Sequence, residues 1–225
     1  MANFVRIRLD TTAPSGISLA INSGQPFSNA QLVDLTIGTS DGITAGYMMK
    51  IWGSVDNAHN ANIQTTEGAS QWITFNTAQQ VKLSATDGSK TLNMKLRDDV
   101  LNISGQASSS IILDTTLAVI TVTGPDRSVI SENPTANIAT LTFTVDTPFV
   151  EYKVKVVSAE GATHSSGALI PTTSGSVNTS GTGTYPASTP INVQITGTDL
   201  KAASATDEEK IIKVFVREAS GNWSI

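Results

Sequence analysis

The sequence predicts an all-β protein made of two antiparallel β-sandwiches in tandem. Thr and Ser make up 55 of the 225 residues (30 and 25), and this bias, together with Val and Ile, favours strands over helices. Short runs alternate apolar and polar residues, which is typical of half-buried strands. A pattern also recurs at a distance of about 100 residues, the length of one sandwich domain. These observations exclude a coiled coil or long-helix protein.

The repeat is defined by two matching pairs of segments. Lys90–Asp98 matches Lys210–Glu218, and Leu9–Thr12 matches Leu113–Thr116. The first pair is separated by 120 positions and continues into the same two residue types, at Asn102 and Ser104 and at Asn222 and Ser224. The second pair is separated by 104 positions, so the second copy carries an insertion of 16 residues. The repeat predicts an N-terminal strand or arm (1–12), a first domain (13–115) and a second domain (116–225).

Individual strands are expected where apolar and polar residues alternate. These runs are Val33–Ile37, Tyr47–Ile51, Leu92–Leu96, Leu141–Val145, Val150–Val156 and Ile191–Ile195. Turn dipeptides such as Asp41-Gly42 and Asp87-Gly88 separate the runs. Together they describe a sandwich of short antiparallel strands.

The insertion is expected in the polar stretch near 158–190 of the second domain. This stretch is rich in Ser, Gly and Thr and poor in large apolar residues, so we expect a long exposed loop, with a ragged hairpin as the alternative for part of it. The one helix candidate is Lys201–Glu209, with about one turn.

Composition excludes several function classes. The net charge is −5 and the pI about 4.9, without the basic stripe of a nucleic-acid-binding domain. Cysteine is absent, which removes disulfides, thiolate nucleophiles and cysteine-based metal sites and favours assembly in a reducing cytosol. No apolar window is long enough for a transmembrane span. The first ten residues lack the apolar run of a signal peptide, because Arg6, Arg8 and Asp10 interrupt it.

Several features carry a family resemblance: a strand ending at Arg97-Asp98, then Asn102 and Ser104, then the strand Ile111–Thr116. This order resembles bacterial-type immunoglobulin-like repeats, in which a Leu-Asp-Thr-Thr-Ala-Pro string closes one domain and opens the next. The string is complete at Leu9–Pro14, whereas Leu117-Ala118 replaces Ala-Pro in the second copy, without the proline that would fix the backbone. The resemblance implies two immunoglobulin-like sandwiches. It also implies a place in bacterial surface adhesins or in phage virion proteins, and a chain with its own Met and no leader favours the phage kind.

Candidate catalytic residues are few. His59 and His164 fall in different predicted domains, so one triad or metal site is not expected to use both. The neighbouring carboxylates Asp98-Asp99 and Glu208-Glu209 lack the evidence of a shared cleft that a glycosidase pair requires. We therefore expect no enzymatic activity and no cofactor.

Two groups of residues are candidates for binding. Asp10 and Asp114, at the domain junctions, are calcium candidates because carboxylates suit that ion and the resemblance implies junction sites; the alternative is that each aspartate opens a turn. Trp52, Trp72 and Trp223 are either packing residues or contacts for a sugar or a subunit. Trp52 is out of phase with the apolar positions of its run, which predicts that it points away from the main core.

The two ends of the sequence are out of phase with the repeat. The strand that closes the first copy, Ser109–Asp114, has no counterpart after Asn222–Ile225, whereas Phe4–Asp10 is a strand of that type with no preceding copy. A sandwich without this strand exposes backbone groups that a strand from elsewhere would pair. We expect Phe4, Val5, Ile7 and Leu9 to dock on the second domain of a neighbouring copy or on another virion protein; the alternative is that they fold back on the first domain.

These expectations favour a non-enzymatic phage structural protein, a component of the tail, baseplate, fibre or head decoration that acts as a rigid spacer and contact module. Its expected partners are other virion proteins or copies of itself, with neither nucleic acid nor membrane. The alternative is an adhesin or glycan-binding module at the bacterial cell surface, with host glycan as its partner. A third reading is an accessory domain of a wall-degrading enzyme.

Overall fold

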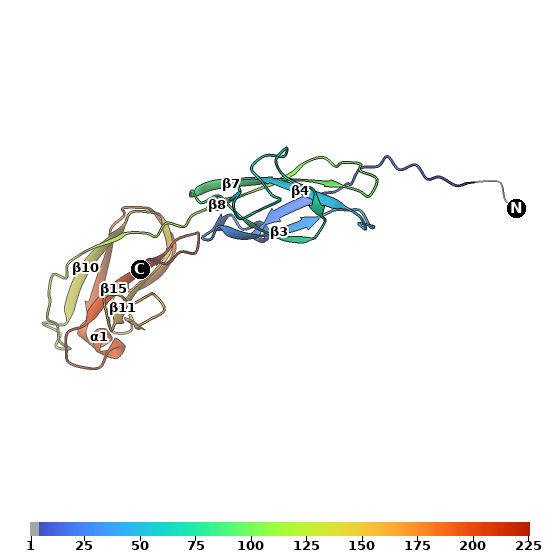
Figure 1. Cartoon of the computed structure of the whole chain (residues 1–225). Coiled ribbons are helices and arrows are strands. Elements are labelled where there is room, and N and C mark those ends of the chain that lie inside the picture. The colour runs from blue at the N-terminus through green and yellow to red at the C-terminus, as the bar shows by residue number, and fades with distance from the viewer. Residues whose placement is uncertain (1–4) are drawn as a thin grey trace. The chain divides into compact units, whose positions relative to one another are not determined.

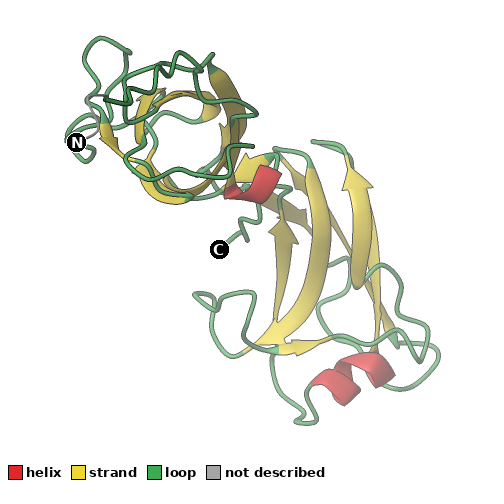
Figure 2. Cartoon of the chain, turned by 90° about the vertical axis from the view of Figure 1, so that its right-hand side faces the viewer, coloured by secondary structure: helices red, strands yellow, loops and turns green. Residues whose placement is uncertain are grey.

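A computed structural model describes residues 5–225 and confirms the predicted all-β class. The chain divides into two compact units, Met1–Thr115 (unit 1) and Thr116–Ile225 (unit 2), and each is a β-sandwich of two sheets. Figure 1 shows the strands of both units, and Figure 2 shows how little helix the chain contains.

Unit 1 has a three-stranded and a five-stranded sheet. The first has the order β1 (Ser18–Ile21), β3 (Leu32–Gly38), β6 (Ala78–Lys82). The second has the order β2 (Phe27–Ser28), β8 (Ala107–Leu113), β7 (Gly88–Arg97), β4 (Met48–Gly53), β5 (Ile73–Thr74). The 3-10 turn η1 (Asn22–Gly24) follows β1. All pairs are antiparallel except β2 with β8. Since β1 and β2 belong to different sheets, the chain crosses from one sheet to the other between them.

The core of unit 1 is aliphatic. The alternating runs predicted from the sequence send every second side chain inward, and these residues are buried, among them Val33, Leu35, Met49, Ile51 and Leu92. Their polar neighbours face outward. Burial of one face of each strand therefore sets the register of both sheets.

Unit 2 has a three-stranded and a four-stranded sheet. The first has the order β14 (Ile191–Thr196), β10 (Ile138–Val145), β9 (Ile120–Thr123). In the second, β11 (Phe149–Val157) pairs on one side with β12 (Ala168–Leu169) and β13 (Ser180–Tyr185), and on the other with β15 (Ile211–Arg217).

The core of unit 2 contains an aromatic cluster. Phe149 stacks on Tyr185 with ring centroids 4.8 Å apart, and Phe143 and Tyr152 pack at an angle around them. Tyr185 lies in the stretch expected to be a loop. The insertion thus supplies part of the core.

Two expectations about unit 2 need correction. The stretch 158–190, expected as an exposed loop or in part a ragged hairpin, contains the strands β12 and β13. Both pair with β11, and the register of β13 shifts between Phe149 and Glu151. The helix α1 spans Gly197–Ala203 instead of 201–209. It begins earlier because the Thr196 hydroxyl accepts a hydrogen bond from the Asp199 backbone N–H and so caps the helix.

Candidate strand-docking site

In unit 1, β8 completes the sheet beside β7. It pairs with β7 from Gly88↔Leu113 to Met94↔Ala107. Ile111 and Leu113 point inward and are buried, whereas Ile112 between them is exposed. β8 also contacts β1 of the other sheet, so it closes this side of the sandwich.

The turn that leads from β7 into β8 recurs after β15 with the same hydrogen bonds. The Ser104 backbone N–H donates to the Leu96 carbonyl at 2.9 Å, and the Leu96 N–H donates to the Ser104 hydroxyl at 2.9 Å. In unit 2, the Ser224 N–H donates to the Val216 carbonyl at 2.9 Å, and the Val216 N–H donates to the Ser224 hydroxyl at 3.0 Å. β15 is therefore the counterpart of β7, displaced by 120 positions.

A further contact fixes the start of each unit to this turn. The Asn102 side-chain N–H donates to the Asp10 carbonyl at 3.3 Å and the Thr12 carbonyl at 3.5 Å. The Asn222 side-chain N–H donates to the Thr116 carbonyl at 3.2 Å. Thr116 lies 104 positions after Thr12, and Asn222 lies 120 positions after Asn102. The two repeated segments, which have different offsets, therefore contact each other in the same way in both units.

β15 lacks the neighbour that β7 has. Within residues 5–225, β15 forms its ladder with β11 alone, and its other edge carries only the single bridge Arg217↔Trp223. Beside this edge lies an apolar groove of about 440 Å³ between β9 and β15. Its lining includes Leu117, Val119, Val122, Ile212, Val214 and Ile225. Leu117, Val119, Val122 and Ile225 are exposed.

The N-terminal segment has the opposite property. Val5, Ile7 and Leu9 are 89%, 91% and 84% exposed, and residues 5–10 form no strand. Figure 1 shows this segment leaving the body of unit 1. Residues 5–9 thus do not fold back on unit 1, which was the alternative expectation. Phe4, the fourth residue predicted to dock, lies outside the described residues.

Trp52 does not form a contact surface, and its assignment as a partner-contact candidate is corrected. As predicted it faces away from the main core, but only 8% of it is exposed. The chain near Gln64 runs beside it, and the Gly53 N–H donates to the Gln64 carbonyl at 3.1 Å. The Lys95 ammonium lies 5.8 Å from the centre of the Trp52 ring. Strand periodicity gives the face on which Trp52 lies but not how deeply it is buried.

Trp223 and Trp72 are each partly exposed and lie near cations. The His164 ring stacks on Trp223 at 4.4 Å, and the Lys153 ammonium lies 4.7 Å from the Trp223 ring centre. The Arg97 guanidinium lies 4.6 Å from the Trp72 ring centre. These contacts occupy the indole rings with partners from the same unit.

The acidic candidates have structural contacts. The Asp10 carboxylate accepts the Thr12 N–H at 3.1 Å, as expected of an aspartate that opens a turn, and the Asp114 N–H donates to the Ser28 carbonyl. Within the described chain, no three His, Asp or Glu side chains gather as a metal site would require. Asp98 is buried and accepts the Val100 and Asn102 N–H groups, so it stabilises the turn after β7.

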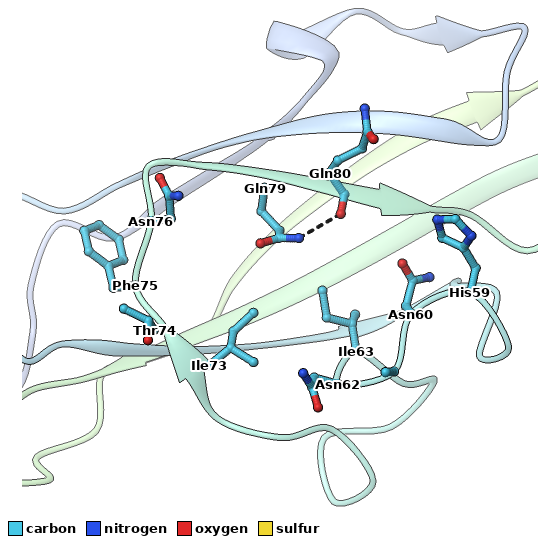
Figure 3. Close-up of a pocket in the computed structure, with 11 residues that line it drawn as sticks. His59, Asn60, Asn62, Ile63, Ile73, Thr74, Phe75, Asn76, Gln79 and Gln80 are labelled. Carbon is cyan, nitrogen blue, oxygen red and sulfur yellow. Dashed lines mark hydrogen bonds between the residues drawn. The ribbon is translucent and has the colours of Figure 1, made fainter.

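A polar pocket of about 490 Å³ lies in unit 1 beside β5 and β6 (Figure 3). His59 is the only ionisable residue in its lining. The side-chain amide of Asn60 is already bonded to the Asp56 and Lys82 carbonyls. The lining brings together neither a nucleophile with a base nor a pair of carboxylates.

Asp199 is a buried carboxylate that sequence reasoning missed. It accepts hydrogen bonds from the Thr173 and Thr196 hydroxyls and from the Ser174 and Ser176 N–H groups, at 2.9–3.2 Å. Burial alone would raise its pKa, but these bonds outweigh burial and lower the pKa to about 2. Asp199 anchors the inserted stretch to α1. It is a single carboxylate outside any recognisable motif, so the sequence did not mark it as a functional or structural site.

Comparison with solved structures gives matches of low sequence identity. Fibronectin(III)-like modules of Clostridium thermocellum CbhA share 10% identity over 92% of this chain and 89% of theirs, with a TM-score of 0.47. Chitinase ChiA74 from Bacillus thuringiensis shares 15% identity over 92% of this chain and 30% of its own, with a TM-score of 0.32. No protein-family model and no curated protein matches the chain. Likeness at this level does not extend to function.

No helix within residues 5–225 has the length and apolar character needed to cross a membrane.

Proposed function

We propose that the chain is a non-enzymatic structural component of a phage particle, which connects proteins through the open edge of unit 2. The observation that carries the proposal is the apolar groove beside β15, because an unpaired strand edge with exposed apolar side chains binds an added strand. The family resemblance of the Leu-Asp-Thr-Thr repeat supports placing it in a virion. Its position there, in the tail, baseplate, fibre or head decoration, belongs to the same proposal.

The contacts of the catalytic candidates support a non-enzymatic role. Asp98 is bonded into a turn, Glu208 accepts a hydrogen bond from the Thr206 hydroxyl at 2.6 Å, and His164 stacks on Trp223. Two compact sandwiches with their own cores suit a spacer that holds partners apart.

Labelled microscopy of particles tests the proposal. Particles purified from a lysate of cells carrying this gene on a phage genome are incubated with an antibody against the 225-residue chain and viewed by negative stain. We expect label at regular positions on the particle, removed when the antibody is first saturated with purified chain. Particles that remain unlabelled, with the chain found only in the particle-free fraction, would overturn the proposal.

A further inference from the structure

We propose that the groove of unit 2 binds residues 5–10 of a second copy, so that copies join head to tail. This inference rests on the proposed function in that it names the partner of the same groove. The binding strand would take the place in unit 2 that β8 takes in unit 1.

The segment has the sequence that the groove requires. Leu9–Thr12 is identical to Leu113–Thr116, which ends β8 and links it to unit 2. Ile7 matches Ile111 at the same offset. Ile111 and Leu113 are the inward, buried residues of β8, so Ile7 and Leu9 have the phase to enter the groove.

The register follows from unit 1. There Lys90 pairs with Ile111 and Leu92 with Ser109. The counterparts of Lys90 and Leu92, 120 positions later, are Lys210 and Ile212. The counterparts of Ile111 and Ser109, 104 positions earlier, are Ile7 and Val5. The same register therefore pairs Lys210 with Ile7 and Ile212 with Val5. Val5 then lies beside Ile212, which lines the groove.

Charge complementarity supports this register on the outward face. Unit 1 pairs the neutral residues Ser89 and Ile112. The corresponding residues between copies are Glu209 and Arg8, and opposite charges directly across two strands attract. Both positions of the pair differ from unit 1, and the change places an acid opposite a base.

A second polar contact is available at the end of the strand. In unit 1 the Asp87 carboxylate accepts the Thr115 N–H at 3.0 Å and the Thr115 hydroxyl at 2.8 Å. The counterpart of Asp87 is Asp207, which is exposed, and the counterpart of Thr115 is Thr11. Docking would thus rebuild between copies the junction that joins unit 1 to unit 2 within one chain.

A second copy suits this strand better than the same chain. Asp10 is held at the Asn102 end of β7, whereas Thr115 is held by Asp87 at the opposite end. The ten residues of β7 span about 33 Å, whereas residues 5–10 span at most about 20 Å. The segment therefore cannot run back along unit 1 to Leu117, where the groove begins.

Sedimentation velocity of the full chain is the first test. At about 1 to 100 μM, where a micromolar complex forms, we expect a series of oligomers that grows with concentration. Deletion of residues 1–9 and the substitution Ile7→Asp should each leave monomers, a loss of at least about 100-fold in association. The matched control is Ile43→Asp, which changes an isoleucine 79% exposed elsewhere on unit 1 and should associate like the natural chain. A natural chain that stays monomeric throughout would overturn the inference.

A mixing experiment tests the head-to-tail mode. One variant lacks residues 1–9 and offers only the groove; a second has a copy of residues 106–114 appended after Ile225, which fills its own groove and leaves only the arm. Each should be monomeric alone, and together they should give a one-to-one dimer that grows no further. Larger species, or association of either variant alone, would contradict docking of the arm in the groove.

Engineered thiols test the register, since the natural chain contains no cysteine. Arg8→Cys with Glu209→Cys should form disulfide-linked multimers on mild oxidation, because directly opposed residues lie within reach of a disulfide. Arg8→Cys with Lys213→Cys, four residues away along β15, should cross-link at least about tenfold less. Equal cross-linking would overturn the register.

These results separate the two proposals. If particles are labelled and the natural chain is monomeric, the proposed role in the virion stands, but a second copy is excluded as the occupant of the groove. Oligomers that depend on the arm, together with unlabelled particles, would establish the docking and exclude the virion role.

Discussion

At the scale of single residues, Asp199 shows how a buried charge is stabilised without an opposite charge. Four backbone and hydroxyl donors surround its carboxylate, and they hold α1 against the stretch 173–176. Hydrogen bonds to an ionised acceptor are stronger than neutral ones, so this site stabilises the insertion.

We expect Asp199→Asn to destabilise unit 2 by about 1–3 kcal/mol at neutral pH, because the amide is a weaker acceptor and brings N–H groups that face other donors. Since folding lowers the Asp199 pKa from 3.8 to about 2, its contribution is complete above about pH 4 and is lost as the pH falls towards 2. Urea denaturation should therefore show a gap between natural and variant protein that narrows from pH 4 to 2. Glu160→Gln, at an exposed position of unit 2, is the control. A gap that widens towards pH 2 would contradict this account.

Trp52 illustrates a residue whose surroundings, rather than its phase, determine its role. We expect Trp52→Ala to lower the unfolding free energy of unit 1 by about 3–5 kcal/mol, because it leaves a cavity in place of a buried indole ring. Trp72→Ala, at a half-buried ring, should cost less. Equal losses for the two variants in urea denaturation would show that Trp52 is not packed as described.

At the scale of elements, the return turns after β7 and β15 are the most similar parts of the two units. The same two side chains bond backbone groups in each turn, and they also define the sequence repeat. They are Asn102 and Ser104 after β7, and Asn222 and Ser224 after β15. The repeat was visible because each of these side chains bonds a specific backbone group, which restricts the residue types that suit the position.

We expect Ser104→Ala and Ser224→Ala to destabilise their respective units by similar amounts, about 1–3 kcal/mol each. Each substitution leaves a buried strand N–H, of Leu96 or of Val216, without its acceptor. Denaturation followed by circular dichroism measures both, with Ser128→Ala at an exposed position as the control. A large difference between the two losses would mean that the turns are not energetically equivalent.

Prediction from the sequence succeeded where burial imposes a period of two residues. The alternating runs coincide with β3, β4, β7, β10, β11 and β14. It failed for β13, whose strand state depends on pairing with β11, and for the start of α1, which depends on the cap at Thr196. It also missed the burial of Trp52, because alternation along a strand gives the face of a side chain and not the depth of its burial.

At the scale of the whole molecule, the two units share a strand plan but differ in their cores. Aliphatic side chains fill unit 1, whereas the core of unit 2 adds stacked Phe and Tyr rings. The repeat could be predicted because its turn residues are similar; this divergence could not, because many apolar side chains satisfy the same alternation.

Separate cores predict separate unfolding. In scanning calorimetry of the full chain we expect two transitions. Leu92→Ala should lower one transition and Val154→Ala the other, each by several degrees, because each creates a cavity in one core only. A substitution that shifts both transitions equally would indicate that the units unfold as one.

The open edge of β15 lies in unit 2 and the exposed residues 5–10 lie in unit 1, and this has a consequence for any fibre joined through them. Such a fibre is polar: one tip presents an unpaired arm and the other an unfilled groove, and only closure into a ring or another protein would fill both. A scaffold that grips only one kind of tip would orient every fibre the same way. A small amount of a protein that resembles only the arm, or only the groove, would set its length.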